Sequence, residues 1–307
     1  MNQLVPYAQL VRLPNTFTAW ADIFLGALAT GLLLERWAKF ACLLAASTLL
    51  YWSGMIWNDY FDLDQDRLER PTRPLASGQV SLGTAWWLGV VFMLFGVSFA
   101  AVADLLSVEN DNVLRFRALP VSVLLVTAIF LYDGMLKTTV AGPIVMGLCR
   151  SLNVLLGLCI LGVLPPFWGW MLALVIGIYI GGVTWFARTE AKTSSQSMLI
   201  AASITMLIGL VLALTVPALA RETTTTAEVS WLFPYVLALL GGYVGVAAIA
   251  AIRRPEPSYV QPVVTRAILG LVVLDALLAS AFVGTLGLLL AALLLPGIFL
   301  GKWLYST

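Results

Sequence analysis

The chain has 307 residues, of which 61% are hydrophobic and 11% charged, and its formal net charge is +1. A soluble domain is about half apolar and a quarter charged, and a disordered chain needs low hydrophobicity, so the composition excludes both. The balanced charge offers no basic surface, and we therefore expect no nucleic-acid partner. The chain contains no histidine, which excludes histidine-based acid–base catalysis and histidine metal ligands.

Long apolar runs recur along the chain, and each is suited to cross a bilayer as a helix. We expect an all-α, polytopic membrane bundle that forms a single domain over residues 1–307. The runs lie at 18–36, 38–57, 82–106, 116–132, 140–163, 167–187, 197–219, 231–252, 263–283 and 285–303. Because the last two could be one broken span, the sequence predicts nine or ten transmembrane helices.

Lysine and arginine are divided unevenly between the two sets of loops. The N-terminus and the even-numbered loops carry ten of these residues: Arg12, Arg67, Arg70, Arg73, Lys137, Arg188, Lys192, Arg253, Arg254 and Arg266. The other loops carry five: Arg36, Lys39, Arg115, Arg117 and Arg221. The positive-inside rule then places the N-terminus and the polar loops in the cytoplasm. We expect an integral, multi-pass protein of a bacterial inner membrane.

The most polar stretch follows the second run and reads NDYFDLDQDR over residues 58–67. If the helix continues through it, Asp59, Asp62 and Asp66 share one face, while Asp64 points elsewhere. Carboxylates gathered on one face repel each other unless a cation lies among them. Ligands that are all oxygen suit Mg²⁺, which commonly completes its shell with phosphate oxygens. The stretch therefore predicts Mg²⁺ and a phosphorylated ligand, with a solvated acidic loop as the alternative.

Three motifs resemble those of one known family. Residues 58–67 resemble the first aspartate-rich motif of the UbiA superfamily of intramembrane prenyltransferases, and RPTRPLASG at 70–78 is similar to the sequence that follows it. YDGMLK at 132–137, followed by AGP at 141–143, resembles the family's Y-x4-K loop. The resemblance covers most of the chain. It implies a bundle of about nine spans, with a central cavity that opens within the membrane near the cytoplasmic face. It also implies Mg²⁺-dependent transfer of a prenyl group from a prenyl diphosphate to an acceptor.

The resemblance also implies roles for individual side chains. Four are expected to hold Mg²⁺, namely Asn58, Asp59, Asp62 and Asp66. Asp59, Asp62 and Lys137 are expected to be catalytic, Lys137 by neutralising the leaving diphosphate. Four are expected to contact the substrate, namely Asn15, Asn58, Arg73 and Tyr132. Arg73 could instead face lipid headgroups, Lys137 could serve topology alone, and Asn15 could simply begin a helix.

Arg150 lies about ten residues inside the fifth run, roughly 15 Å along a helix. A charge at that depth costs about 2.5–3.5 kcal/mol on insertion scales, so we expect a carboxylate or phosphate partner. Asn153 lies on the same helical face. We assign Arg150 a catalytic role and Asn153 a substrate-binding role, with a structural ion pair as the alternative. Asp22 and Asp275 are further intramembrane acids that could pair with Arg150 or with each other.

The chain departs from the family after the sixth run, where a second aspartate-rich motif usually helps to hold a second Mg²⁺. Residues 186–193 read FARTEAKT, in which only Glu190 is acidic. Glu190 could meet a metal already bridged by diphosphate, or Arg188 and Lys192 could bind phosphate directly. The RTEA sequence resembles a UbiA-like branch encoded in bacterial Ebo gene clusters and associated with cyclitol-type molecules. That branch favours O-prenylation of a polyhydroxylated acceptor, whereas a quinone-pathway member favours C-prenylation of an aromatic ring.

Three other functions compete with prenyl transfer. A relative whose second motif has decayed could bind or carry an isoprenoid lipid without turnover. A CDP-alcohol phosphotransferase also groups aspartates around Mg²⁺, but its D-G-x2-A-R-x8-G-x3-D-x3-D pattern begins at Asp133 and then fails. A secondary transporter would fit the number of spans, but spans broken by proline or glycine in symmetric positions are not evident.

Overall fold

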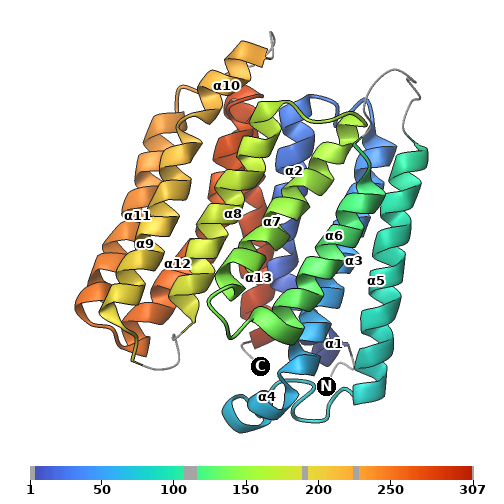
Figure 1. The fold of residues 1–307 in the computed structure, drawn as a ribbon, viewed down its shortest axis with the longest axis vertical. Helices are drawn as coiled ribbons and strands as arrows, with labels where there is room; N and C mark the ends of the chain where they lie inside the picture. Colours follow the sequence, from blue (N-terminus) through green and yellow to red (C-terminus); the bar gives the residue numbers. More distant parts are fainter. Residues whose placement is uncertain (1–3, 107–115, 189–192, 224–227, 306–307) are drawn as a thin grey trace.

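A computed structural model describes residues 4–106, 116–188, 193–223 and 228–305, and these form a bundle of long helices (Figure 1). The first half comprises α1 (Val5–Leu10), η1 (Leu13–Asn15), α2 (Thr16–Thr30), α3 (Trp37–Phe61), α4 (Leu63–Glu69), α5 (Leu82–Leu105), α6 (Ala118–Leu131) and η2 (Tyr132–Leu136). The second half comprises α7 (Gly142–Leu158), η3 (Cys159–Leu161), α8 (Phe167–Ala187), α9 (Gln196–Ala213), α10 (Val216–Thr223), α11 (Phe233–Arg253), α12 (Pro257–Ala279), η4 (Gly284–Leu293) and α13 (Leu294–Tyr305). The predicted all-α fold is confirmed.

Within the described residues, nine helices are long and apolar enough to cross a membrane. The last two predicted runs fall on separate elements, α12 and the η4–α13 pair, and are not one broken span. The first run behaves differently, because α2 ends at Thr30, where Gly31 adopts a left-handed φ of 69° that closes the helix. With 15 residues, α2 extends only about 22 Å and is not among the nine.

Small residues allow the helices that carry the polar side chains to approach closely. A Cβ at Gly157 of α7 would lie 2.8 Å from the carbonyl oxygen of Ile23 in α2, and one at Gly147 would lie 2.4 Å from that of Gly177 in α8. Backbones in contact at this distance are typical of membrane bundles, where van der Waals packing replaces the hydrophobic effect. The α2–α7 contact therefore brings distant parts of the chain together in the interior.

One end of the bundle carries α1, α4 and both chain termini, while α10 lies at the other end (Figure 1). We call the first the polar end. Here the Gln9 side chain donates to the Leu304 carbonyl at 2.8 Å, which joins α1 to α13. The Ser194 amide donates to the Pro255 carbonyl at 2.9 Å, which joins two further connections. The polar end is thus a set of loops and short helices held against one another.

Candidate functional site

The acidic residues of the first motif lie at the polar end, where α3 passes into α4. An unbroken helix does not form, because α3 ends at Phe61 and α4 begins at Leu63. Asp62 between them has φ −86° and ψ 4°, yet its amide still donates to the Asn58 carbonyl at 3.0 Å. The helical register is therefore nearly kept across a kink. Asp64 is solvent-exposed, as its position on the other helical face predicts.

Two arginines neutralise the buried carboxylates of this segment. Arg73, in the loop after α4, places Nη1 at 3.2 Å from Asp59 Oδ1 and 2.6 Å from Asp66 Oδ2. Arg12 places Nη2 at 3.0 Å from the same Asp59 oxygen and donates to Asn58 Oδ1, also at 3.0 Å. Asp59 and Asp66 are both buried. They therefore share Arg73 between them, and Asp59 has a second cation in Arg12.

Arg12 is a site residue that the sequence does not reveal. It lies between α1 and η1 with φ 48° and ψ 53°, and it is the one non-glycine residue with a positive φ in the described ranges. Such backbone conformations cost of the order of 1–3 kcal/mol and gather at functional sites. In the sequence analysis Arg12 is counted only among the lysine and arginine residues that predict which side of the membrane is cytoplasmic. Nothing near it indicates that the turn brings its side chain to the end of α3.

The connection from α6 to α7 closes the site from another side. Tyr132 opens a π-helical turn, η2, in which the Lys137 amide donates to the Tyr132 carbonyl at 2.9 Å. Single π-turns are rare and are frequent at functional sites. The turn lets Lys137 Nζ form an ion pair with Asp62, while Asp133 Oδ1 accepts from Asn58 Nδ2 at 2.8 Å. The motifs at 58–67 and 132–137 therefore meet, and Asp133 joins them although the sequence predicted no role for it.

Aromatic rings flank Asn58 and Asp59. The Trp57 ring lies 5.5 Å from that of Tyr60, 5.9 Å from that of Phe61 and 5.2 Å from that of Phe130, measured between centroids. Offset and edge-on pairs at these distances are favourable, and the faces of such rings attract cations. The polar cluster therefore adjoins an aromatic surface contributed by α3 and α6.

The remaining predicted residues of the polar end are less tightly engaged. Arg188, just after α8, donates from Nη2 to the Thr138 carbonyl at 2.8 Å and is exposed, so it lies beside the loop that carries Lys137. Asn15 is exposed at the start of α2, and its side chain makes no capping hydrogen bond. Glu190 and Lys192 fall outside the described residues.

Arg150 and Asn153 belong to a second network, deeper in the bundle. Arg150 Nη1 lies 2.9 Å from Asp22 Oδ2, and its Nη2 donates to Thr18 Oγ1 at 2.6 Å. Asn153 Nδ2 donates to the same Asp22 oxygen at 2.9 Å, and Ser47 donates to Asn153 Oδ1 at 2.7 Å. Ser47 precedes Asn58 by 11 residues in α3, about 16 Å along the helix. The expected carboxylate partner of Arg150 is therefore Asp22, and this network is separate from the polar end.

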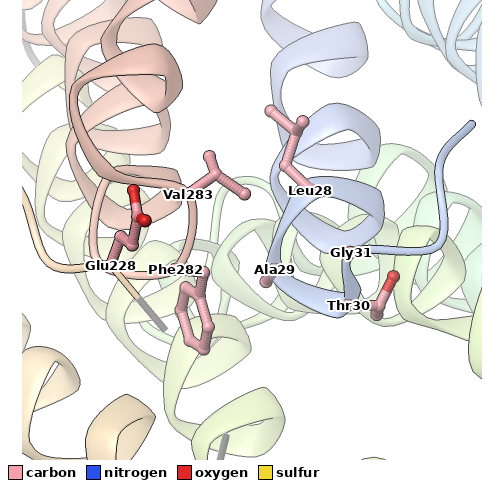
Figure 2. A pocket seen from close by; sticks show the side chains of 7 residues that line it. All are labelled: Leu28, Ala29, Thr30, Gly31, Glu228, Phe282 and Val283. Carbon is pink, nitrogen blue, oxygen red and sulfur yellow. The ribbon is translucent and has the colours of Figure 1, made fainter. Parts of the chain in front are cut away.

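A pocket of about 270 Å³ lies at the far end of α2 (Figure 2). Its lining comprises Leu28, Ala29, Thr30, Gly31, Glu228, Phe282 and Val283. Glu228 is the one ionisable group in that lining. Because Asn15 and Thr30 bracket α2, the pocket lies about 22 Å from the polar end. We therefore assign the candidate site to the polar end, and the cavity expected there stays a prediction.

The oxygen donors of the polar end suit Mg²⁺, although those that the structure describes do not form a preassembled metal site. Among the described residues, no group of three or more cysteine, aspartate or glutamate side chains is arranged to hold a metal ion. The oxygen donors of the first motif instead meet Arg12, Arg73 and Lys137. Mg²⁺ usually takes one or two carboxylates and completes its shell with waters and phosphate oxygens. The donor set is therefore of the type that binds Mg²⁺ together with a phosphate.

Residues 19–266 match the UbiA prenyltransferase family. The chain belongs to this family. Digeranylgeranylglyceryl phosphate synthase from Sulfurisphaera tokodaii is 27% identical over 156 residues, which cover 49% of this chain and 51% of that protein. The synthase from Methanopyrus kandleri is 35% identical over 133 residues, which cover 43% and 44%. The chain thus spans about half the length of the curated relatives that it matches.

Solved structures share the fold along nearly the whole chain. A structure of digeranylgeranylglyceryl phosphate synthase has a TM-score of 0.64 at 17% identity and covers 97% of this chain and 100% of that one. A UbiA homologue from Archaeoglobus fulgidus, bound to GPP and Mg²⁺, has a TM-score of 0.58 at 15% identity and covers 94% and 99%. These likenesses establish the fold of this UbiA-family chain.

Proposed function

We propose that this UbiA-family protein is a Mg²⁺-dependent prenyltransferase, which moves a prenyl group from a prenyl diphosphate to a small hydroxylated acceptor and releases diphosphate. The observation that carries the proposal is the network at the polar end. It gathers the carboxylates of Asp59, Asp62 and Asp66 against Arg12, Arg73 and Lys137. An anionic ligand can replace the carboxylates as the partner of the basic side chains, and a divalent cation can replace the basic side chains as the partner of the carboxylates.

The basic side chains of the network can exchange their carboxylate partners for a diphosphate because they are positively charged and partly exposed to solvent. The side chains of Arg12, Arg73 and Lys137 are 28%, 21% and 29% exposed, so each can turn toward an incoming diphosphate. The carboxylates that they leave, together with Asn58, would then hold Mg²⁺. When bound, this ion neutralises the diphosphate and makes it a better leaving group. Arg12, Arg73 and Lys137 would stabilise the charge that develops on the departing oxygens.

The bond changes define what the other residues must do. The bond between the prenyl carbon and the diphosphate oxygen breaks, a bond from that carbon to the acceptor forms, and the acceptor loses a proton. The allylic carbon carries positive charge during the step, and the Trp57, Tyr60, Phe61 and Tyr132 rings beside the motifs are suited to shield it. Arg188, next to the Lys137 loop, and Asn15 are assigned to substrate binding. Glu190 is assigned to the metal and Lys192 to the phosphate.

The names of the relatives bear on the acceptor. Each curated relative named above is a digeranylgeranylglyceryl phosphate synthase, a name that describes prenyl groups on a glyceryl phosphate. This supports a hydroxylated, polyol-like acceptor, cyclitols included, and O-prenylation over transfer to an aromatic ring. The protein would act as an integral membrane enzyme, with its polar end and N-terminus in the cytoplasm of a bacterial inner membrane.

The decisive experiment measures diphosphate release from purified protein in nanodiscs. Geranyl and geranylgeranyl diphosphate serve as donors, with Mg²⁺ and with glycerol phosphate, cyclitols or aromatic acids as acceptors, and mass spectrometry identifies the product. Asp59→Ala and Asp62→Ala should abolish release. Asp64→Ala is the matched control, because Asp64 belongs to the same segment but is solvent-exposed. Full activity in both Asp59→Ala and Asp62→Ala would overturn the proposal.

A carrier of isoprenoid lipid is the second candidate, and the observation that favours it is the second motif, in which Glu190 is the only acid. A carrier would bind the donor, with affinity reduced by Asp59→Ala, but release no diphosphate with any acceptor or with cell extract. The same assay, run with a binding measurement, separates the two functions.

A further inference from the structure

Asp22 of α2 and Asp275 of α12 are both completely buried, and they face each other across the contact between these helices. Each carboxyl group lies close enough to the other to interact with it directly. Asp22 Oδ2 accepts from Arg150 and Asn153. In contrast, Asp22 Oδ1 and both Asp275 oxygens meet no hydrogen-bond donor within the described part of the chain.

Two ionised carboxylates cannot account for this arrangement. Neither would carry a hydrogen to donate, and three buried oxygens would stay without a partner, which is strongly unfavourable in an apolar interior. The charges would not balance either, since Arg150 is the one cation paired with the cluster among the described residues. A net charge of −1 would then be buried far from water.

Among the described residues, the helices packed around the pair place no cation other than Arg150 against it. The α3 helix offers Ser47 and Tyr51 near Arg150, and the Tyr179 hydroxyl of α8 donates instead to the Ala267 carbonyl at 3.0 Å. The η4 segment, which contacts both α2 and α12, has no ionisable side chain over Gly284–Leu293. The missing positive charge must therefore come from a small ion held between the two carboxyl groups.

We propose that this ion is a proton, which Asp275 holds at neutral pH and donates to Asp22 Oδ1. One proton supplies both a donor and the missing charge, so that Asp22, Arg150 and Asp275 become a neutral cluster joining α2, α7 and α12. A sodium ion is a poorer fit, because the pair offers three unpartnered oxygens and no other buried side-chain oxygen without a partner occurs in the described residues. The inference does not rest on prenyl transfer.

Infrared spectroscopy of the protein in nanodiscs at neutral pH tests this directly, because a protonated carboxyl group has a carbonyl band that a carboxylate lacks. We expect wild type to show such a band, and Asp275→Asn to lose it. Asp64→Asn is the matched control and should leave it unchanged, since Asp64 is solvent-exposed and pairs with Arg67 outside the buried cluster. Labelling with 13C-aspartate should shift the band in wild type, which identifies an aspartic acid without any variant.

Thermal stability gives a second, independent readout. The Asp275→Asn amide can donate to Asp22 as the proton does, so we expect a melting temperature within about 3 °C of wild type. Asp22→Asn leaves Arg150 without its counter-ion and should lower the melting temperature by about 10 °C. A wild-type spectrum with no protonated aspartate band would overturn the proposal. A band that persists in Asp275→Asn would also overturn it. So would a wild-type melting temperature that is higher in sodium than in potassium salt, because that result would indicate a bound sodium ion.

Discussion

The ion pair between Arg73 and Asp66 offers the sharpest test of the network at the polar end. Arg73 Nη1 lies 2.6 Å from Asp66 Oδ2, and the two side chains are 21% and 6% exposed. Removing one partner of a fully buried pair costs about 3–5 kcal/mol, because the other charge stays desolvated. Arg73 is partly reached by water, so we expect Arg73→Ala to lower the unfolding free energy by about 2 kcal/mol.

A double-mutant cycle isolates the pair from the rest of the site. Unfolding of Arg73→Ala, Asp66→Asn and the double variant would be measured in detergent micelles, and we expect a coupling energy of about 1–2 kcal/mol. The matched control is the pair between Arg67 and Asp64, at 3.3 Å on the solvent-exposed side of α4. It should show no measurable coupling, because exposed pairs are screened by water and salt.

Additive effects of Arg73→Ala and Asp66→Asn, within about 0.5 kcal/mol, would refute this reasoning. The same variants also test the metal assignment. If Asp59 and Asp66 help to hold Mg²⁺, adding the ion should recover part of the stability that Arg73→Ala loses, and chelation should remove it again. A loss of stability that is the same with and without Mg²⁺ would contradict a metal site at these carboxylates.

Three further predictions concern catalysis, packing and the metal. Lys137→Ala should reduce turnover about 10²–10³-fold through loss of charge stabilisation, with Lys137→Arg retaining more activity; an unchanged rate of diphosphate release would remove Lys137 from the site. Gly157→Ala should lower the unfolding free energy by about 1–3 kcal/mol, because its Cβ would lie 2.8 Å from the Ile23 carbonyl oxygen. Gly242→Ala is its control, since it meets nothing within 4 Å, and equal effects would contradict the close contact. Chelation should abolish diphosphate release and Mg²⁺ should restore it, and turnover that survives chelation would count against a metal requirement.

The sequence predicts the helices well because the bilayer fixes their length and composition. The α12 and η4–α13 elements lie close to the predicted runs, since long apolar segments have few alternatives in lipid. The first run fails at its end because Gly31 stops α2, and the left-handed conformation of a glycine depends on its local context. Helix ends are therefore predicted less well than helices.

The candidate site was likewise predicted in part from the sequence. The spacing of Asp59, Asp62 and Asp66 indicates a shared face, and all three meet cations at the polar end. The kink at Asp62 and the inward turn of Arg12 are not visible in the sequence, because both depend on contacts between segments far apart in the chain. The same holds for the partner of Arg150, since Asp22 lies 128 residues away.

The two polar networks differ in a way that bears on function. At the polar end Arg12, Arg73 and Lys137 are each between a fifth and a third exposed, so exchanging a carboxylate for a phosphate requires only side-chain motion. In the deeper network Asp22 is fully buried, and Arg150 is bonded to both Asp22 and Thr18. Releasing Arg150 would leave two desolvated charges, at a cost of several kcal/mol. We therefore propose that Arg150 acts as a structural ion pair that fixes α2 against α7, and that Arg12, Arg73 and Lys137 at the polar end are the cations that meet diphosphate.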